Sequence, residues 1–290
     1  MEYVVHILIL IAIYTTLATS LDLLVGETGL LSAAQAAFFG VGAYTSALLS
    51  TRYGLSFLSG VAAGMALAIA LSTLVALISL RVQEDYFVIA TFALQIIAFS
   101  IFNNWIDVTQ GPSGVANIPP PEILGWNVQA SGDFLVLAAG VAAIAYCLVS
   151  RITASPFGRV LRAIREDDVF TQAQGKNTLR FKLEVSGISA GLAAAAGSVY
   201  AYYLTFIDPT TFTITQSILL ISMVILGGAG SRMGPLVGAA FLVVLPEALR
   251  FVGISSASAA NLQAILYGAA LVGLMMVRPR GLLGRYSFGQ

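Results

Sequence analysis

Few residues of this chain could do chemistry, and most of them are charged. The 290 residues include 14 Lys or Arg and 14 Asp or Glu. A catalytic site would need paired carboxylates, a nucleophile with its base, or a metal cluster, and we expect none here. Four charged residues fall near the ends of apolar runs, where they can reach water: Asp22, Glu184, Glu247 and Arg250. Because a charge at the bilayer centre is costly and usually marks an ion path, this placement argues against a proton- or sodium-driven transporter, although Asp22 keeps that alternative open.

The isolated reactive side chains predict no site either. Cys147 is the single cysteine, which excludes an internal disulfide and a Cys-based metal cluster. His6 is the single histidine and has no neighbour at ligand spacing. The pair Gly175-Lys176 lacks the earlier glycine of a phosphate-binding loop. We therefore expect no cofactor in this chain, and any ATP-driven step must use another subunit.

The densest charge lies between residues 155 and 182. Apolar residues recur there at helical spacing, with charged residues between them. The apolar positions are Val160, Leu161, Ile164, Val169, Phe170 and Ala173, and the charged ones are Arg159, Arg162, Arg165, Glu166, Asp167 and Asp168. Pro156 suits a helix start and Gly175 a helix end. Such a surface helix either rests on a membrane interface or docks into a groove of a soluble partner, and the pattern leaves both open.

The surrounding elements must be membrane helices. Hydrophobic residues make up 58% of the chain and charged residues 10%, whereas soluble domains carry roughly 25% charge. Apolar runs cover residues 4–24, 30–49, 55–80, 87–102, 134–149, 185–204, 214–226, 235–249 and 260–277. Only helices and closed barrels satisfy the backbone in hydrocarbon, and the runs lack the alternation of barrel strands. The sequence predicts an all-α bundle of about nine spans, with residues 1–290 as one membrane domain. The zero formal charge gives no sign of a nucleic-acid partner.

Lys and Arg residues predict the orientation of the bundle. They concentrate in residues 151–182 and in the tail, 278–290, so both segments should be cytoplasmic. Residues 103–132 contain none and should form an outer loop. This arrangement puts the N-terminus outside, and it leaves Arg52 and Arg250 on the outer face against the trend.

The second apolar run is interrupted by glycines. Gly26, Gly29, Gly40 and Gly42 punctuate it, together with Gln35. A broken helix at membrane depth is tolerated only where protein or a water-filled cavity surrounds it. The run predicts a broken or deeply buried central helix, or else close helix packing through small residues.

Longer motifs are spread over nearly the whole chain. They read GETGLLSAAQAAFFGVGAYTSALL (26–49), DYFVIATFALQII (85–97), NNWIDVTQGPSGVANIPPP (103–121), SPFGRVLRAIREDD (155–168), QGKNTLRFKLEVSGISAGLAAAAGSVYA (174–201), ILGGAGSRMGPLVGAAFLVVLPEALR (225–250) and RPRGLLG (278–284). In this order, they resemble the permeases of branched-chain amino acid ATP-binding-cassette importers, LivM type.

The resemblance implies a multi-pass subunit of a bacterial or archaeal plasma membrane that works by alternating access. Its implied partners are a sister permease of the LivH type, two ATP-binding subunits that use ATP and Mg²⁺, a substrate-binding protein outside, and the lipid bilayer. Residues 151–182 would then dock on an ATP-binding subunit, with Gly158, Arg159, Arg162, Ala163, Arg165 and Gly175 in the coupling region. The outer loop residues Trp105, Thr109, Gly111, Pro112 and Gly114 would lie toward the binding protein.

The expected substrate is a zwitterion with an aliphatic side chain, namely Leu, Ile or Val. Candidates for lining its path are Gln35, Phe38, Phe39, Tyr44, Thr91 and Gln95, each of which could instead serve packing. The same family fold also serves urea and short-amide importers, so a urea permease is an alternative. A secondary transporter or facilitator is the alternative from another class.

Overall fold

The computed structural model describes residues 2–80, 84–123, 126–250, 268–269, 273, 276 and 281–283. The long helices are α1 (Glu2–Thr28), α2 (Gln35–Tyr53), α3 (Phe57–Ser79), α4 (Glu84–Asn104), α6 (Ser131–Ala154), α9 (Thr178–Leu204), α10 (Ile214–Gly227) and α11 (Gly234–Arg250). The short ones are α5 (Ile106–Thr109), α7 (Pro156–Glu166), α8 (Asp168–Ala173) and the 3-10 turns η1 (Gly111–Ser113) and η2 (Pro209–Phe212). The two-residue strands β1 (Glu122–Ile123) and β2 (Trp126–Asn127) pair antiparallel. The predicted all-α class is confirmed.

A helix lies at each of the first eight predicted runs. The ninth, residues 260–277, and the tail, 278–290, lie almost wholly outside the described residues. Within the described residues, four helices are long and apolar enough to cross a membrane, namely α1, α3, α4 and α6. Helices α10 and α11 are apolar but shorter. The number of spans therefore stays a prediction.

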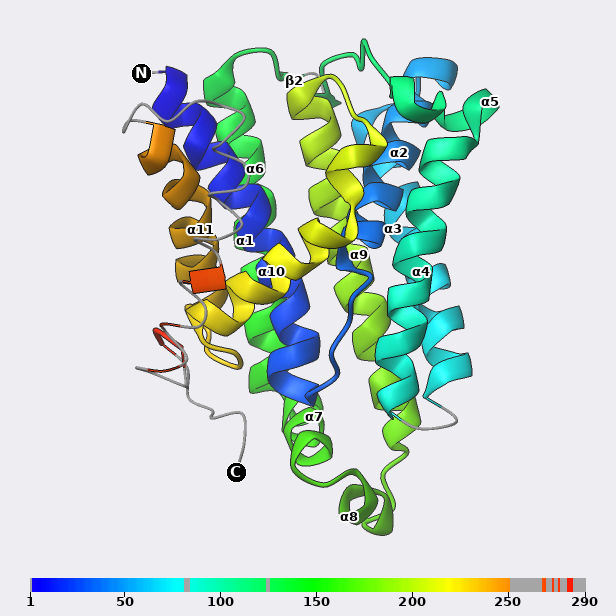
Figure 1. Ribbon diagram of the computed structural model, residues 1–290, viewed down its shortest axis with the longest axis vertical. Coiled ribbons are helices and arrows are strands. Elements are labelled where there is room, and N and C mark those ends of the chain that lie inside the picture. The colour runs from blue at the N-terminus through cyan, green and yellow to red at the C-terminus, as the bar shows by residue number, and fades with distance from the viewer. Residues whose placement is uncertain are drawn as a thin grey trace.

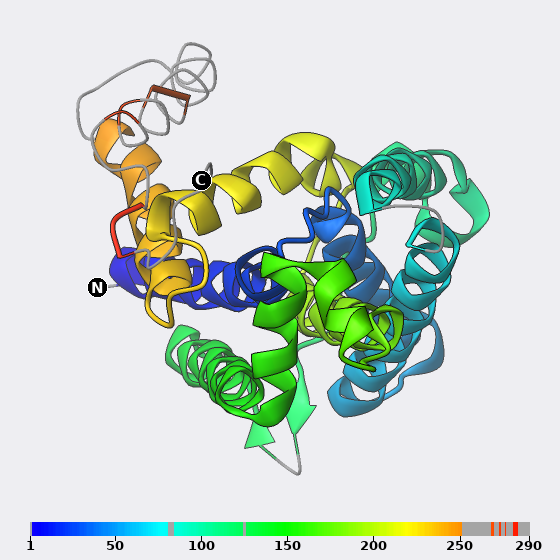
Figure 2. The same ribbon diagram turned by 90° about the horizontal axis from the view of Figure 1, so that it is seen from below.

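The bundle has two central helices, surrounded by helices that expose apolar side chains. Seen from below, α2 and α9 lie in the interior, with α3 and α4 on one side and α1 and α6 on the other (Figure 2). Nearly every residue of α9 from Val185 to Tyr202 is buried, whereas α3, α4 and α6 expose large apolar side chains. The central helices can be rich in Gly, Ala and Ser because helices, not lipid, cover them.

The central pair packs at backbone distance. A Cβ at Gly42 of α2 would overlap the backbone of Ala194, and one at Gly197 of α9 would overlap the backbone of Phe39. Small residues at both faces let the two backbones approach closely. The predicted close packing and the predicted burial of α2 are thus both present.

The chain between α1 and α2 is not helical. Residues 29–34 are irregular, and Gly29 has a φ of +74°. They rise from the lower end of α1 into the bundle before α2 begins (Figure 1). Helix α2 itself is unbroken, so the interruption lies in the connection before it, and Gly29 supplies the left-handed backbone that begins this connection.

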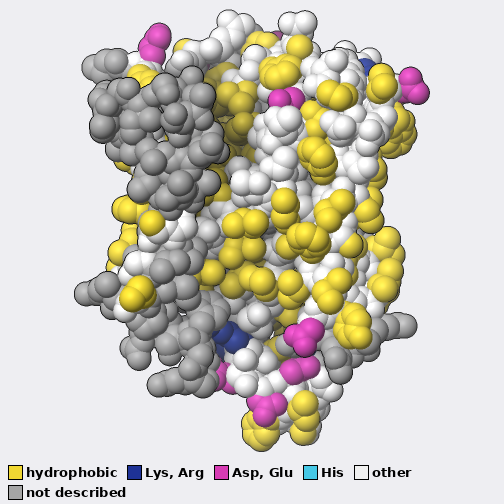
Figure 3. Space-filling view, viewed as in Figure 1, with side chains coloured by type: hydrophobic (Ala, Val, Ile, Leu, Met, Phe, Trp, Pro, Cys, Tyr) yellow, Lys and Arg dark blue, Asp and Glu magenta, His cyan; other side chains and the backbone are white. Residues whose placement is uncertain are grey.

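The two polar segments lie at opposite ends of the molecule. Helices α7 and α8 project at the lower end, whereas α5 and the β hairpin lie at the upper end (Figure 1). On the visible described face, charged side chains lie near the two ends and hydrophobic ones between them (Figure 3). At the α5 end, Arg52 Nη2 donates to the carbonyls of Asp107 and Val108 at 2.6 and 2.9 Å. Those bonds stabilise Arg52 at an end of the molecule where few other Lys or Arg residues lie.

Candidate functional site

The segment between α6 and α9 is two helices and not the single helix that was predicted. Ser155 caps α7, and its Oγ accepts from the Gly158 backbone N–H at 3.4 Å. The helix stops at Glu166 because Asp167 is extended, with a φ of −157°, and becomes the cap of α8. Its Oδ1 accepts from the Phe170 N–H at 2.8 Å. A carboxylate cap satisfies a free N–H of the first turn, so the break is stabilised locally.

The break also divides the predicted apolar stripe. Leu161 and Ile164 of α7 are buried against the subunit itself, whereas Val169 and Phe170 of α8 are 76% and 61% exposed. Gly158 is buried as well, and a Cβ there would overlap Thr153. The apolar face of α7 thus serves packing, and that of α8 is left uncovered.

Arg162 joins α7 to the end of α1. Its Nη1 donates to Glu27 Oε2 at 2.9 Å and to the Thr153 carbonyl at 3.0 Å. The Glu27 side chain is 10% exposed and that of Arg162 is 48% exposed. A carboxylate so deeply placed needs a partner, because an uncompensated buried charge is strongly unfavourable.

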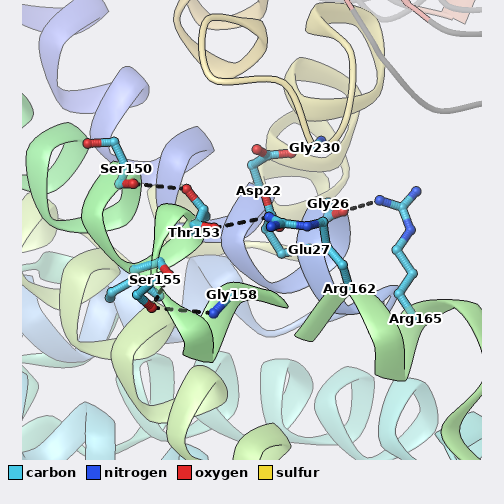
Figure 4. A network of polar contacts seen from close by, with 11 residues as sticks. Asp22, Gly26, Glu27, Ser150, Thr153, Ser155, Gly158, Arg162, Arg165 and Gly230 are labelled. Carbon is cyan, nitrogen blue, oxygen red and sulfur yellow. Dashed lines mark hydrogen bonds and ion pairs between the residues drawn. The ribbon is translucent and has the colours of Figure 1, made fainter. Parts of the chain in front are cut away.

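A second set of bonds adds the turn between α10 and α11. Arg165 donates to the Gly26 carbonyl, and the Gly230 N–H donates to Asp22 Oδ1 at 2.8 Å (Figure 4). A Cβ at Gly26 would overlap Asp22 and the Gly230 backbone. These six residues, Asp22, Gly26, Glu27, Arg162, Arg165 and Gly230, form what we call the α1–α7 junction.

A cavity of about 380 Å³ opens beside this junction. Charged side chains from three elements line it, namely Glu27, Arg162, Arg165, Glu166 and Arg232. Both signs of charge face the same space, so the cavity is polar without being strongly biased toward anions or cations.

The remaining residues of the predicted coupling region lie on the surface. Arg159, Ala163 and Gly175 are exposed. Behind them, Lys182 Nζ lies 2.9 Å from Asp168 Oδ2. Burial raises the pKa of Asp168, but the hydrogen bonds and charge of Lys182, with Thr178 and Gln172, outweigh it and hold that pKa below its usual value. This ion pair ties α8 to the first turn of α9.

A second polar cluster surrounds the start of α2. Gln95 Oε1 accepts from the Ala37 N–H at 2.7 Å, and Ser217 Oγ accepts from the Ala36 N–H at 3.0 Å. Thr91 Oγ1 accepts from the Ala33 N–H at 3.2 Å. The first N–H groups of a helix have no partner within it, so Gln95 and Ser217 cap a helix start that is buried in the bundle. Thr91 holds the chain just before that start.

The path candidates are all buried around α2. Gln35 Nε2 donates to Ser20 Oγ at 2.6 Å, and Gln95 Nε2 donates to the Phe212 carbonyl at 2.8 Å. Phe39 packs on Phe212, and the Tyr44 ring stacks on Phe102 at 4.6 Å between centroids. Phe38 is buried too. The structure buries all six around α2, and their role in a path stays a prediction.

The outer-loop candidates are divided between surface and interior. Trp105 is exposed, while Thr109 is buried and donates to the carbonyls of Phe102 and Trp105, both at 2.8 Å. Gly111 is buried, and Pro112 and Gly114 complete the turn around η1.

The sequence did not single out several residues of these clusters. Glu27 and Gly230 have partners 135 and 208 residues away, and Thr153 contributes only its backbone carbonyl to Arg162. Ser217 is a single polar residue within an apolar run. An acidic residue in the last turn of a long apolar helix is the one signal that points to Glu27. In the described part of the chain, no group of three or more His, Cys, Asp or Glu side chains could hold a metal ion.

The chain is similar over nearly its whole length to known transport permeases. Residues 3–277 match the family described as branched-chain amino acid transport system / permease component. The chain is 31% identical to the high-affinity branched-chain amino acid transport system permease protein LivM of Escherichia coli K12, over 96% of this chain and 69% of that protein. The LivM protein of Salmonella typhimurium LT2 is 30% identical, over 93% and 68% of the two chains.

A probable LivM protein of the archaeon Methanocaldococcus jannaschii is 26% identical over 71% of this chain and 61% of its own length. No solved structure matches the chain. A family match over almost the whole length, with two relatives at 30% identity or more, shows that the chain belongs to the branched-chain amino acid transport system permease family.

Proposed function

We propose that the chain is the membrane-spanning subunit of an ATP-binding-cassette importer for branched-chain amino acids. It forms half of the translocation path, and a sister permease forms the other half. Two ATP-binding subunits hydrolyse ATP with Mg²⁺ below it, and a substrate-binding protein delivers the substrate from outside. The proposal rests on the family and on the names of relatives that cover most of the chain.

The observation that best supports the mechanism is the exposed apolar surface of the helix pair α7–α8. Two apolar side chains, Val169 and Phe170, stand uncovered at the end of the molecule that holds most of the basic residues. Exposed apolar residues next to dense charge are typical of a protein contact. We infer that α8 makes the contact with the ATP-binding subunit, and that the surface residues Arg159, Ala163 and Gly175 flank it.

The orientation follows from the same segment. Basic residues favour the cytoplasmic side of an inner membrane, so the α7–α8 end is cytoplasmic and the α5 end lies outside. Residues 103–132, with Trp105 exposed among them, then face the substrate-binding protein. The path lies near α2, where Gln35, Phe39 and Gln95 gather.

Uptake by the reconstituted complex tests the function. Vesicles holding this chain with its co-purifying partners should take up radiolabelled leucine only with ATP inside and binding protein outside. ATP-dependent uptake of urea instead would keep the mechanism and change the substrate. Uptake by this chain alone, without ATP, would place it among the facilitators and sink the proposal.

A substitution at the tip of α8 tests the contact. Phe170→Ala should lower ATP-driven uptake because it removes the largest exposed apolar group there. Val136→Ala is a matched control, since Val136 is also 61% exposed but lies on α6. Co-purification of the ATP-binding subunit should weaken with Phe170→Ala and stay unchanged with Val136→Ala. Equal retention of that subunit by both variants would exclude α8 as the docking element.

A further inference from the structure

We propose that Glu27 and Asp22 of α1 are positioning residues that make α7, α1 and the turn of residues 228–233 move as one body during transport. The proposal rests on the proposed function, and it adds which parts of the chain receive the movement of α7. Neither acid would touch the substrate or the ATP-binding subunit. They act by holding three segments together.

The contacts join these segments through different groups. Arg162 reaches Glu27 at 2.9 Å, and Arg165 reaches the carbonyl of Gly26, so two arginines of α7 engage the last turn of α1. Asp22 accepts from Gly230 at 2.8 Å, which adds the turn. A displacement of α7 alone would have to break an ion pair and a charged hydrogen bond at the same time.

Burial makes the junction stiff. As whole residues, Asp22 is 6% and Glu27 8% exposed, so Asp22 is buried and does not reach water as predicted. The space between α1 and the turn does not admit even a Cβ at Gly26. Removing one partner of a buried charge leaves the other uncompensated, and a backbone contact this close cannot slide without moving one whole segment. The α1–α7 junction therefore transmits displacement and does not absorb it.

Two glycines lie where the chain passes from the α1–α7 junction into neighbouring segments. Gly29 follows α1 with a φ of +74°, and Gly228 follows α10 with a φ of +107°. Both conformations lie in the left-handed region and open onto irregular chain. Beyond Gly29, the start of α2 is held by Gln95 of α4 and Ser217 of α10, and Gln35 also donates to Ser20 of α1 at 2.6 Å. Backbone rotation at these glycines would let the junction move while α2 keeps its own anchors.

The test measures leucine uptake and ATP hydrolysis in the same vesicles, using the complete complex. Glu27→Gln keeps the shape of the side chain but removes the charge that Arg162 needs. The matched control is Glu184→Gln, because Glu184 also pairs with an arginine, Arg180 at 2.7 Å, but on an exposed face of one helix. We expect Glu27→Gln to lower the leucine imported per ATP about tenfold, within the range of coupling between sites, and Glu184→Gln to leave it unchanged.

A restored pair distinguishes transmission from simple stability. The double variant Glu27→Arg, Arg162→Glu rebuilds an ion pair at the same place, and it should recover much of the ratio lost in Glu27→Gln. Recovery supports the proposal. A wild-type ratio in Glu27→Gln, an assembled double variant without recovery, or failure of both to assemble would each overturn it.

The wild-type complex separates this proposal from the function beneath it. If the wild type shows no ATP-driven uptake, the importer assignment fails and the junction proposal fails with it. If the wild type transports and Glu27→Gln transports equally well per ATP, only the junction proposal fails. Asp22→Asn, which keeps the size of the side chain, should change the ratio in the same direction as Glu27→Gln.

Discussion

Gln95→Leu should destabilise the fold more than the similar volumes of the two side chains suggest. The Gln95 amide makes three contacts that a leucine cannot make: it accepts from Ala37 N–H at 2.7 Å and from Ser217 Oγ at 3.2 Å, and it donates to the Phe212 carbonyl at 2.8 Å. The residue is 1% exposed, so water cannot replace them. Leucine has a similar volume, so the effect should come from lost bonds and not from a cavity.

The magnitude follows from the number of bonds. Hydrogen bonds between membrane helices contribute about 0.6 kcal/mol each on average, and a buried group left unsatisfied costs about 1–3 kcal/mol. Three lost bonds with the Ala37 N–H left without an acceptor therefore predict a loss of about 3 kcal/mol in the free energy of unfolding. Helix α2 should lose order at its start first.

Unfolding in mixed micelles with rising dodecyl sulfate, followed by the helical circular dichroism signal, measures this difference. Asn104→Leu is the matched control, because Asn104 is an exposed amide on the same helix that bonds only to Ser100. The control should shift stability by about 0.5 kcal/mol at most. A loss below 1 kcal/mol in Gln95→Leu would refute the view that the buried start of α2 depends on this cap.

Two further predictions concern the central packing and the α8 anchor. Gly197→Ala should destabilise the chain by about 2 kcal/mol through overpacking against Phe39, while Gly140→Ala, with open space around it, should be neutral or slightly stabilising; thermal unfolding in detergent measures both, and equal effects would contradict the backbone contact. Because the folded state lowers the pKa of Asp168, its stabilising effect is present above the usual value of 3.8 and is lost as pH falls further. Asp168→Asn should therefore be less stable than the wild type at pH 7, and the gap should close below pH 3.8; a gap that does not change with pH would rule out the ion pair with Lys182 as its cause.

The positions of the helices could be predicted from hydropathy, but the central pair needed more. Peripheral helices such as α3 show apolar side chains along their length, so hydropathy alone predicts them. Helix α9 is rich in Gly, Ala and Ser because other helices cover it. Its partner α2 begins at Gln35, five residues after the start of the predicted apolar run. The glycines around Gly29 predicted a break, whereas the position of the new start at Gln35 depends on caps from α4 and α10.

The sequence predicted which segment holds the candidate site, but not the contacts that its residues make. The charge of residues 155–182 marked the stretch that forms α7 and α8, but helical spacing could not show that Asp167 would leave the helix and cap α8. Nor could it show that Arg162 pairs within the chain, because Glu27 lies 135 residues away. Periodicity describes neighbours along a helix, and long-range pairing is set by how helices α1, α6 and α7 meet.

The two polar clusters hold the consecutive helices α1 and α2 through different kinds of contact. Helix α1 is fixed by charge at its last turns, to α7 and to the turn of residues 228–233, whereas α2 is fixed by neutral caps to α4 and α10. The two helices are consecutive and residues 29–34 link them, while Gly228 joins α10 directly to the turn of residues 228–233. Along that link the Ala33 N–H is held by Thr91 of α4, which places the end of the link with the α2 group. Relative movement of the two groups would therefore require backbone rotation near Gly29 and near Gly228, where the φ angles are positive.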